Sequence, residues 1–179
     1  MSVSPLNTIY ANEIFRMAEE KKDKVFYNSS TVHACIVHQA LAKYATGYID
    51  IFSSSMCTEI SNNKDYCKYI ENYLEGGKER KIRIILTDYS ERFNQTKIGQ
   101  LFAKYSGQVS IKSYKGSVKY KNTPAHFTVS DDRAFRLETD IDQHMAFGNF
   151  NSPEQARALR ETFDKIFNSP LAKEVCLVH

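Results

Sequence analysis

The residues best suited to chemistry lie between His126 and Asn151. His126 enters a short run typical of a strand, and the small-residue turn Gly148 to Asn151 comes just before a helix start. Unpaired backbone N–H groups and the dipole at a helix N-terminus both favour a bound phosphate. The combination of strand, turn and helix start therefore predicts an anion site in this stretch.

A basic and aromatic segment, residues 112–121, lies just ahead of His126. Its four lysines, Lys115 and Lys119 among them, are interleaved with two tyrosines. Phosphate attraction combined with base stacking is what a strand of nucleic acid needs from a protein surface. The segment therefore favours a polyanionic ligand, and the alternative is a solvated loop without a binding role.

The periodicity of apolar residues and several short β-branched runs predict the elements that position these groups. Predicted helices cover residues 7–22, 32–44, 64–74 and 91–105. Predicted strands cover residues 25–27, 48–52, 82–86, 109–111, 126–129, 134–138 and 145–147. Helices that alternate with short strands imply crossover connections. The predicted fold class is α/β, a mixed and largely parallel sheet flanked by helices on both faces.

A last helix begins after Ser152. Ser152 is the predicted N-cap, Pro153 occupies the first helical position, and Gln155 completes a capping box. On the strand before it, Arg136 and Glu138 point to one face because strand side chains alternate. These two residues have either a site role or the ordinary role of a surface ion pair.

The composition is that of an ordinary globular protein. The 179 residues carry a net charge of +3, too small by itself to indicate a nucleic-acid binder. The four scattered cysteines favour reduced thiols over a disulfide scaffold or a metal site. Residues 1–10 have no signal-peptide pattern, and no stretch is apolar enough to span a bilayer. We expect a single cytoplasmic domain over residues 1–179, with an N-terminal extension at 1–29 and a core at 30–168.

In the order of its elements and in part of its motif, the chain resembles a single repeat of the phospholipase D superfamily. That family carries His-x-Lys-x4-Asp, followed by Gly-Ser-x-Asn. His126 matches the histidine, and Gly148 and Asn151 match the glycine and the asparagine. The family's lysine, aspartate and serine are replaced, in that order, by Thr128, Arg133 and Asn149. The interval from His126 to Gly148 is longer than in the family, which predicts an extra hairpin.

The resemblance implies a phosphodiesterase that needs neither a metal ion nor a cofactor. Among phosphodiesterases, a nuclease is the kind that the sequence favours. His126 would attack phosphorus to form a phosphohistidine, and a second histidine would protonate the leaving oxygen. A single repeat holds one such histidine, so the resemblance implies a homodimer with its site at the interface. The expected catalytic residues are His126 and Asn151. The expected substrate-binding residues are Thr128, Arg133, Arg136, Glu138, Asn149, Lys115 and Lys119.

A different class of function stays open. The missing lysine and aspartate favour a degenerate member that binds or regulates, with nucleic acid or a protein as partner. In that case His126 is a hydrogen-bonded strand residue without chemistry. Hydrolysis or transfer of a lipid headgroup is a third possibility, but no membrane-directed feature supports it. Of the other histidines, His33 and His38 are expected to be structural, and His144 has no predicted partner.

Overall fold

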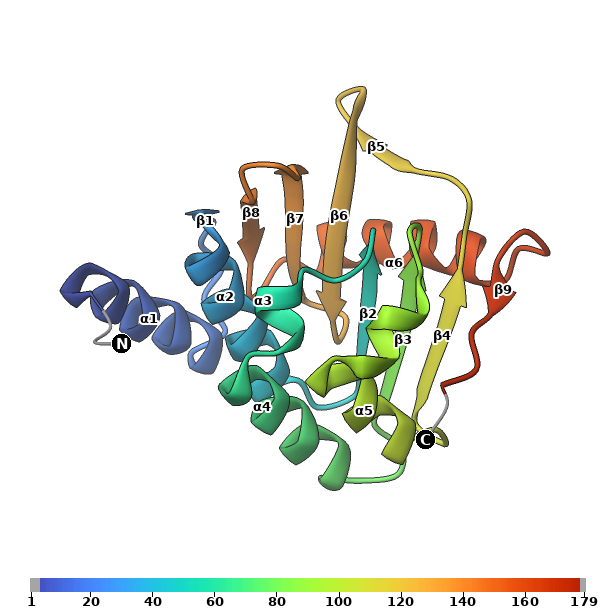
Figure 1. Ribbon diagram of the computed structural model, residues 1–179. Helices are drawn as coiled ribbons and strands as arrows, with labels where there is room; N and C mark the ends of the chain where they lie inside the picture. The colour runs from blue at the N-terminus through green and yellow to red at the C-terminus, as the bar shows by residue number, and fades with distance from the viewer. Residues whose placement is uncertain (1–3, 178–179) are drawn as a thin grey trace.

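The computed structural model describes residues 4–177, and within them nine strands form one sheet in the order β1-β8-β7-β6-β2-β3-β4-β9, with β5 beside β6 (Figure 1). The strands are β1 (Phe26–Ser29), β2 (Tyr48–Ser53), β3 (Lys81–Leu86), β4 (Val109–Ser113), β5 (Val118–Tyr120), β6 (Thr123–Ser130), β7 (Ala134–Asp140), β8 (Met145–Asn149) and β9 (Lys173–Glu174). The helices are α1 (Pro5–Glu19), α2 (Thr31–Tyr44), α3 (Thr58–Ser61), α4 (Lys64–Glu75), the 3₁₀ turn η1 (Glu91–Gln95), α5 (Lys97–Lys104) and α6 (Pro153–Phe167).

The sheet is mixed, as predicted, but antiparallel pairs outnumber parallel ones where a largely parallel sheet was expected. The reason is that short turns join β5 to β6, β6 to β7 and β7 to β8, and strands joined by short turns pair antiparallel. The parallel part is confined to one half. β2 and β4 each run parallel to β3. The other half is antiparallel, with β6 beside β2 and with β7, β8 and β1 following in turn. The β7–β8 hairpin agrees with the extra hairpin that the long interval after His126 predicted. The β2 strand therefore lies where the parallel and antiparallel halves meet.

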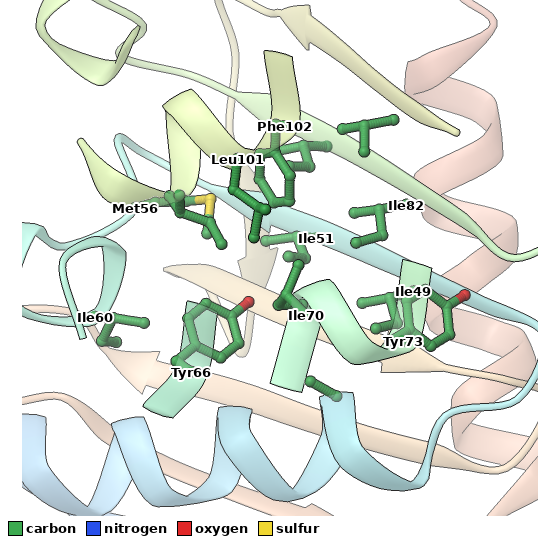
Figure 2. Packing of buried hydrophobic residues seen from close by; sticks show 14 of the residues in the cluster. Ile49, Ile51, Met56, Ile60, Tyr66, Ile70, Tyr73, Ile82, Leu101 and Phe102 are labelled. Carbon is green, nitrogen blue, oxygen red and sulfur yellow. The ribbon is translucent and has the colours of Figure 1, made fainter. Parts of the chain in front are cut away.

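Helices cover both faces of the sheet. The helices α2, α4 and α5 lie on the near face in Figure 1, whereas α6 lies alone behind the sheet. Figure 2 shows the near-side packing, in which Tyr66, Ile70 and Tyr73 of α4 face Ile51 and Ile82 on the sheet. Tyr66 and Tyr73 are therefore part of the core.

On the far side α6 packs on the phenylalanine face of the sheet. Phe163 of α6 contacts Phe127 edge-on, and Phe127 stacks on Phe52 with ring centroids 5.4 Å apart. An acidic and basic network lies beside these rings. Asp50 of β2 accepts two hydrogen bonds of 2.7 Å from Arg83, which also reaches Asp164 of α6 at 2.8 Å. This network helps to hold α6 on the far face of the sheet. The polar groups described below lie on the near face.

Two local predictions were wrong. The helix predicted over 91–105 is divided into η1 and α5, because Thr96 interrupts it and caps α5 by accepting a hydrogen bond from the Gly99 N–H at 3.1 Å. At the start of α6, Pro153 takes the predicted position, but the capping box does not form. The Ser152 hydroxyl instead donates to the side chain of Gln155 and caps no backbone N–H. The short elements α3, β5 and β9 were not predicted.

The β6–β7 turn sets the register on which the site depends. Ser130 pairs with Ala134, which leaves a three-residue turn, and Asp131 adopts a left-handed backbone with φ 54°. The Asp131 carboxylate accepts a hydrogen bond of 2.7 Å from the Gly47 N–H and others from its neighbours. The resulting register pairs His126 with Glu138 and Thr128 with Arg136.

Candidate active site

One end of the near face gathers the polar groups of β6 and β7. Since directly paired residues of an antiparallel ladder share a face, His126, Thr128, Arg136 and Glu138 all point to the same side. All four are buried, His126 with 9% of its surface exposed and Arg136 with 3%. Buried ionisable groups need partners, and these residues find them in one another.

Glu138 is the centre of this group. Its Oε2 lies 3.0 Å from Nδ1 of His126, and its Oε1 accepts a hydrogen bond of 2.8 Å from Nη2 of Arg136. Burial alone would raise the pKa of Glu138, but the hydrogen bond with His126 and the charge of Arg136 outweigh burial and lower this pKa to about 2. The carboxylate is therefore ionised at neutral pH, so Nδ1 of His126 must carry the hydrogen. The basic nitrogen of His126 is then Nε2, the atom suited to attack or to accept a proton.

Arg136 is held in place from two directions. Its Nε donates to Oδ1 of Asn28 at 3.0 Å, and Nη2 donates to Glu138. Its third nitrogen, Nη1, makes no hydrogen bond within residues 4–177, and this atom is not fully buried. Nη1 is thus the guanidinium atom left to meet an anion.

These groups open into a pocket of about 210 Å³ at the carboxyl end of β2. We call it the β2 pocket; its walls are the end of β2 with the loop to Cys57, His38 of α2, and residues of β6, β7 and the β7–β8 turn. Ser53, Ser54 and Ser55 line it from the end of β2 and the loop that follows. In open α/β sheets, ligands bind beyond the carboxyl ends of strands where the topology changes direction, and β2 is that position here.

Three of the predicted site residues lie elsewhere. Arg133 is in the β6–β7 turn at the other end of β6, where it donates to the carbonyls of Tyr44 and Phe150 at 3.1 and 2.9 Å. Asn149 pairs with Phe135 and points to the face opposite His126, where it donates to Asp23 at 2.8 Å.

Asn151 follows Asn149 at the start of α6. Its N–H donates to the side chain of Asn149, and both line a different pocket, beside Asp23 and Glu154. Two carboxylates at that helix start disfavour the phosphate that the turn alone predicted. Gly148 has a packing role, because a Cβ there would overlap the Phe135 carbonyl and the Phe26 ring.

The two predicted lysines occupy the exposed β4–β5 region. Lys119 pairs with Pro124 of β6, and Pro124 shares its face with His126 two residues later. Lys119 therefore points to the side of the sheet that holds the β2 pocket. The β5–β6 hairpin extends beyond the upper end of the rest of the sheet in Figure 1. Neither Lys115 nor Lys119 lines the pocket itself.

Sequence reasoning missed Asn28, His38 and His144. His144 lies in the β7–β8 turn, with Nδ1 3.3 Å from Oε1 of Glu138. His38 lines the pocket from α2, half-buried against the ring of Tyr66. Burial, followed by repulsion from Arg136, lowers the pKa of His38 to about 3. No local sequence pattern marks these residues, and only the structure shows that three of the five histidines converge on one carboxylate and its pocket.

Comparison with known proteins places the chain in a family. Residues 30–173 match the profile of a family described as a domain of unknown function, DUF7931. The chain belongs to the DUF7931 family. No curated protein shows a significant sequence match to this DUF7931 chain.

Solved structures show which fold this DUF7931 chain has. NucT from Helicobacter pylori matches with a TM-score of 0.58 and 15% identity, over 85% of this chain and 99% of that one. The phospholipase D family member Nuc from Salmonella typhimurium matches with a TM-score of 0.56 and 13% identity, over 85% and 97%. The archaeal chromatin protein TrmBL2 matches with a TM-score of 0.62 and 16% identity over 95% of this chain, which spans 62% of the TrmBL2 chain. The fold is therefore phospholipase D-like.

Within residues 4–177 no group of three or more His, Cys, Asp or Glu side chains is arranged to hold a metal ion. In the same range, no helix is both long and apolar enough to cross a bilayer.

Proposed function

We propose that this DUF7931 chain is a phosphodiesterase that works without a metal ion, and that His126 is its nucleophile. The observation that carries the proposal is the His126–Glu138 pair, 3.0 Å apart, at the mouth of the β2 pocket of a phospholipase D-like fold. A carboxylate that fixes the tautomer of a histidine is the usual way to present a basic nitrogen to a reacting centre.

The chemistry follows from the groups around the pocket. Nε2 of His126 attacks phosphorus and the bond to the leaving oxygen breaks, which gives a phosphohistidine. Attack puts a positive charge on the imidazole, and the adjacent carboxylate of Glu138 stabilises it. Arg136 offers Nη1 to the phosphate oxygens, because Thr128 brings no charge to the position of the family's lysine. The motif is degenerate in this sense: its lysine is replaced in function by an arginine from the neighbouring strand.

The resemblance also supplies an assembly. It implies a homodimer in which the second copy's His126 protonates the leaving oxygen and then activates water. The substrate class that we propose is nucleic acid. Lys119 on the same face as His126, with Lys115 in the exposed β4–β5 loop, supports a phosphate backbone entering the β2 pocket from the β5–β6 hairpin. That the DNA-binding chromatin protein TrmBL2 shares the fold supports the same class of ligand.

A second candidate function is binding without hydrolysis. It is favoured by Thr128, which is 3% exposed and cannot supply the charge that the family's lysine provides. The chain would then hold nucleic acid or a protein partner through the same surface and leave it intact.

The test is hydrolysis of single-stranded DNA, RNA and bis(p-nitrophenyl) phosphate in EDTA. Wild type should turn over at least one substrate, and His126→Ala should lose the activity. His33→Gln is the matched control, because His33 stacks on Tyr10 at 3.9 Å and does not line the β2 pocket. Circular dichroism and a thermal melt must show that each variant is folded. If the folded wild type cleaves none of the three substrates but binds single-stranded DNA, the enzyme hypothesis is wrong and the second candidate function, binding without hydrolysis, is supported.

A further inference from the structure

Glu138 holds two histidines of the same chain. Its Oε2 meets Nδ1 of His126 at 3.0 Å, and its Oε1 meets Nδ1 of His144 at 3.3 Å. Both rings line the β2 pocket. Since the ionised carboxylate of Glu138 engages Nδ1 of both rings, Nε2 is the nitrogen of each ring that is available to a ligand in the pocket.

The position of His144 is fixed by more than this contact. Its carbonyl oxygen accepts a hydrogen bond of 2.6 Å from Nδ2 of Asn28. Its backbone is left-handed, with φ 52°, a conformation that costs a non-glycine residue free energy of order 1 kcal/mol or more. Histidine adopts this conformation more often than most residue types, so the turn accommodates it. The backbone and the contacts with Asn28 and Glu138 together fix where the His144 ring lies.

We infer that His144 is the second histidine of the reaction, supplied by the same chain that carries His126. This inference rests on the proposed phosphodiesterase function and departs from its homodimeric chemistry. The charged groups that line the pocket beside His144 and His126 are Glu138 and Arg136, while His38 faces the pocket from α2. Glu59 of α3 does not line the pocket but lies near enough to His144 for their charges to interact. With His144 protonated and His126 neutral, Glu138 and Arg136 offset each other. The pocket then carries one net positive charge, matched to the single negative charge of a phosphodiester.

The two steps balance as follows. In the first, Nε2 of His126 forms a bond to phosphorus, the bond to the leaving oxygen breaks, and Nε2–H of His144 gives its proton to that oxygen. In the second, water attacks phosphorus while Nε2 of His144 takes its proton. The phosphorus–nitrogen bond breaks and its electron pair returns to His126. Both histidines end in their starting states, and no further reactant is needed.

His144→Asn is the informative variant. Asparagine tolerates the left-handed backbone and retains an N–H donor for Glu138, but it transfers no proton. p-Nitrophenolate leaves without an acid, whereas the alkoxide leaving group of DNA needs one. On bis(p-nitrophenyl) phosphate in EDTA, His144→Asn should release one p-nitrophenolate per chain in a burst and then turn over at least about 100-fold more slowly than wild type. Intact-mass spectrometry should find the phosphoryl adduct trapped on the chain, and cleavage of single-stranded DNA should fall by a similar factor.

Gln143→Ala is the matched control, since Gln143 is the exposed neighbour in the same turn. It should keep wild-type turnover and show no burst. An active wild type that depends on His126, together with a His144→Asn variant that turns over like Gln143→Ala, would overturn the inference and leave the proposed function standing. An inactive wild type without an adduct would instead remove the proposed function, and this inference with it.

Discussion

Asn28 joins the N-terminal strand to the centre of the site, because its Oδ1 accepts a hydrogen bond of 3.0 Å from Nε of Arg136. Asn28 lies on β1, which pairs with β8, and it is 3% exposed. It precedes the segment matched by the family profile, which begins at residue 30. Residues assigned from sequence to an N-terminal extension therefore contribute a strand to the sheet and a contact to the candidate site.

The first prediction concerns this contact. Asn28→Ala removes the acceptor for Arg136 and the donor to the His144 carbonyl, which leaves buried polar groups unpaired. We expect the free energy of unfolding to fall by about 1–3 kcal/mol, measured by urea denaturation. Ser29→Ala, on the exposed side of the same strand, should change it by less than about 0.5 kcal/mol. Equal stabilities for the two variants would show that the contact contributes nothing.

The second prediction concerns the shape of the Arg136 side chain. Arg136→Lys keeps a charge but cannot donate to Asn28 and Glu138 at once and also present a third nitrogen to a ligand. We expect kcat/KM for the phosphodiester to fall by about 10²–10³. Arg157→Lys, on the exposed side of α6, should leave kcat/KM unchanged. Wild-type kcat/KM in Arg136→Lys would mean that charge alone suffices.

The third prediction is a pH dependence of stability. The pKa of His38 is lowered from 6.5 to about 3, and that of Glu138 from 4.5 to about 2. Both folded-state values lie below the unfolded ones, so each group stabilises the fold above its unfolded pKa and loses this contribution as pH falls. Between pH 6.5 and 4.5 His38 contributes a slope of at most about 1.4 kcal/mol per pH unit, less where water enters the pocket. Burial also lowers the pKa of His33, which acts in the same direction.

Urea unfolding at a series of pH values checks this, with His38→Gln as the comparison. The variant should lose the part of the slope between pH 6.5 and 4.5 that belongs to His38, and keep both the part that belongs to His33 and the further loss below 4.5 that belongs to Glu138. A His38→Gln curve parallel to that of wild type over the upper interval would assign the slope to other groups.

The fourth prediction concerns the exposed Lys119. Lys119→Ala should weaken binding of single-stranded DNA and reduce the slope of log affinity against log salt by about 0.7, the value for one lost phosphate contact. Lys104→Ala is the control, because Lys104 is also exposed but ends α5, ahead of the amino end of β4. A salt slope that is the same in both variants would place the nucleic acid away from the β5–β6 hairpin.

Local pattern predicted most of the fold and part of the site. Period-two alternation correctly placed Arg136 and Glu138 on one face, and the histidine-led run correctly marked β6. The His126–Glu138 pair was beyond reach, since it depends on whether the turn holds two residues or three. The left-handed backbone of Asp131 decides this, and a shift of one residue would reverse the face of every β7 side chain.

The other residues of the site are positioned by contacts between segments far apart in the sequence, so they could not be predicted from local pattern. Asn28 reaches the pocket through the β1–β8 ladder, and His38 through the packing of α2, and neither follows from local spacing. Arg133 was predicted at the site because it stands at the family's aspartate position, but it serves the β6–β7 turn. Asn149 was predicted beside His126, yet the alternation of β8 turns it to the far face.

The hydrogen bond from Asn28 to the His144 carbonyl spans 116 positions of the chain, and this separation has a consequence for synthesis on the ribosome. The α2–β2–α4–β3 half closes short loops, so it can form early, whereas β1 must wait for β8 before it can pair. A growing chain therefore has its anion-facing arginine unsupported and its histidines unaligned until β8 has been made. For the proposed nuclease, the candidate site is therefore incomplete on a nascent chain that lacks β8.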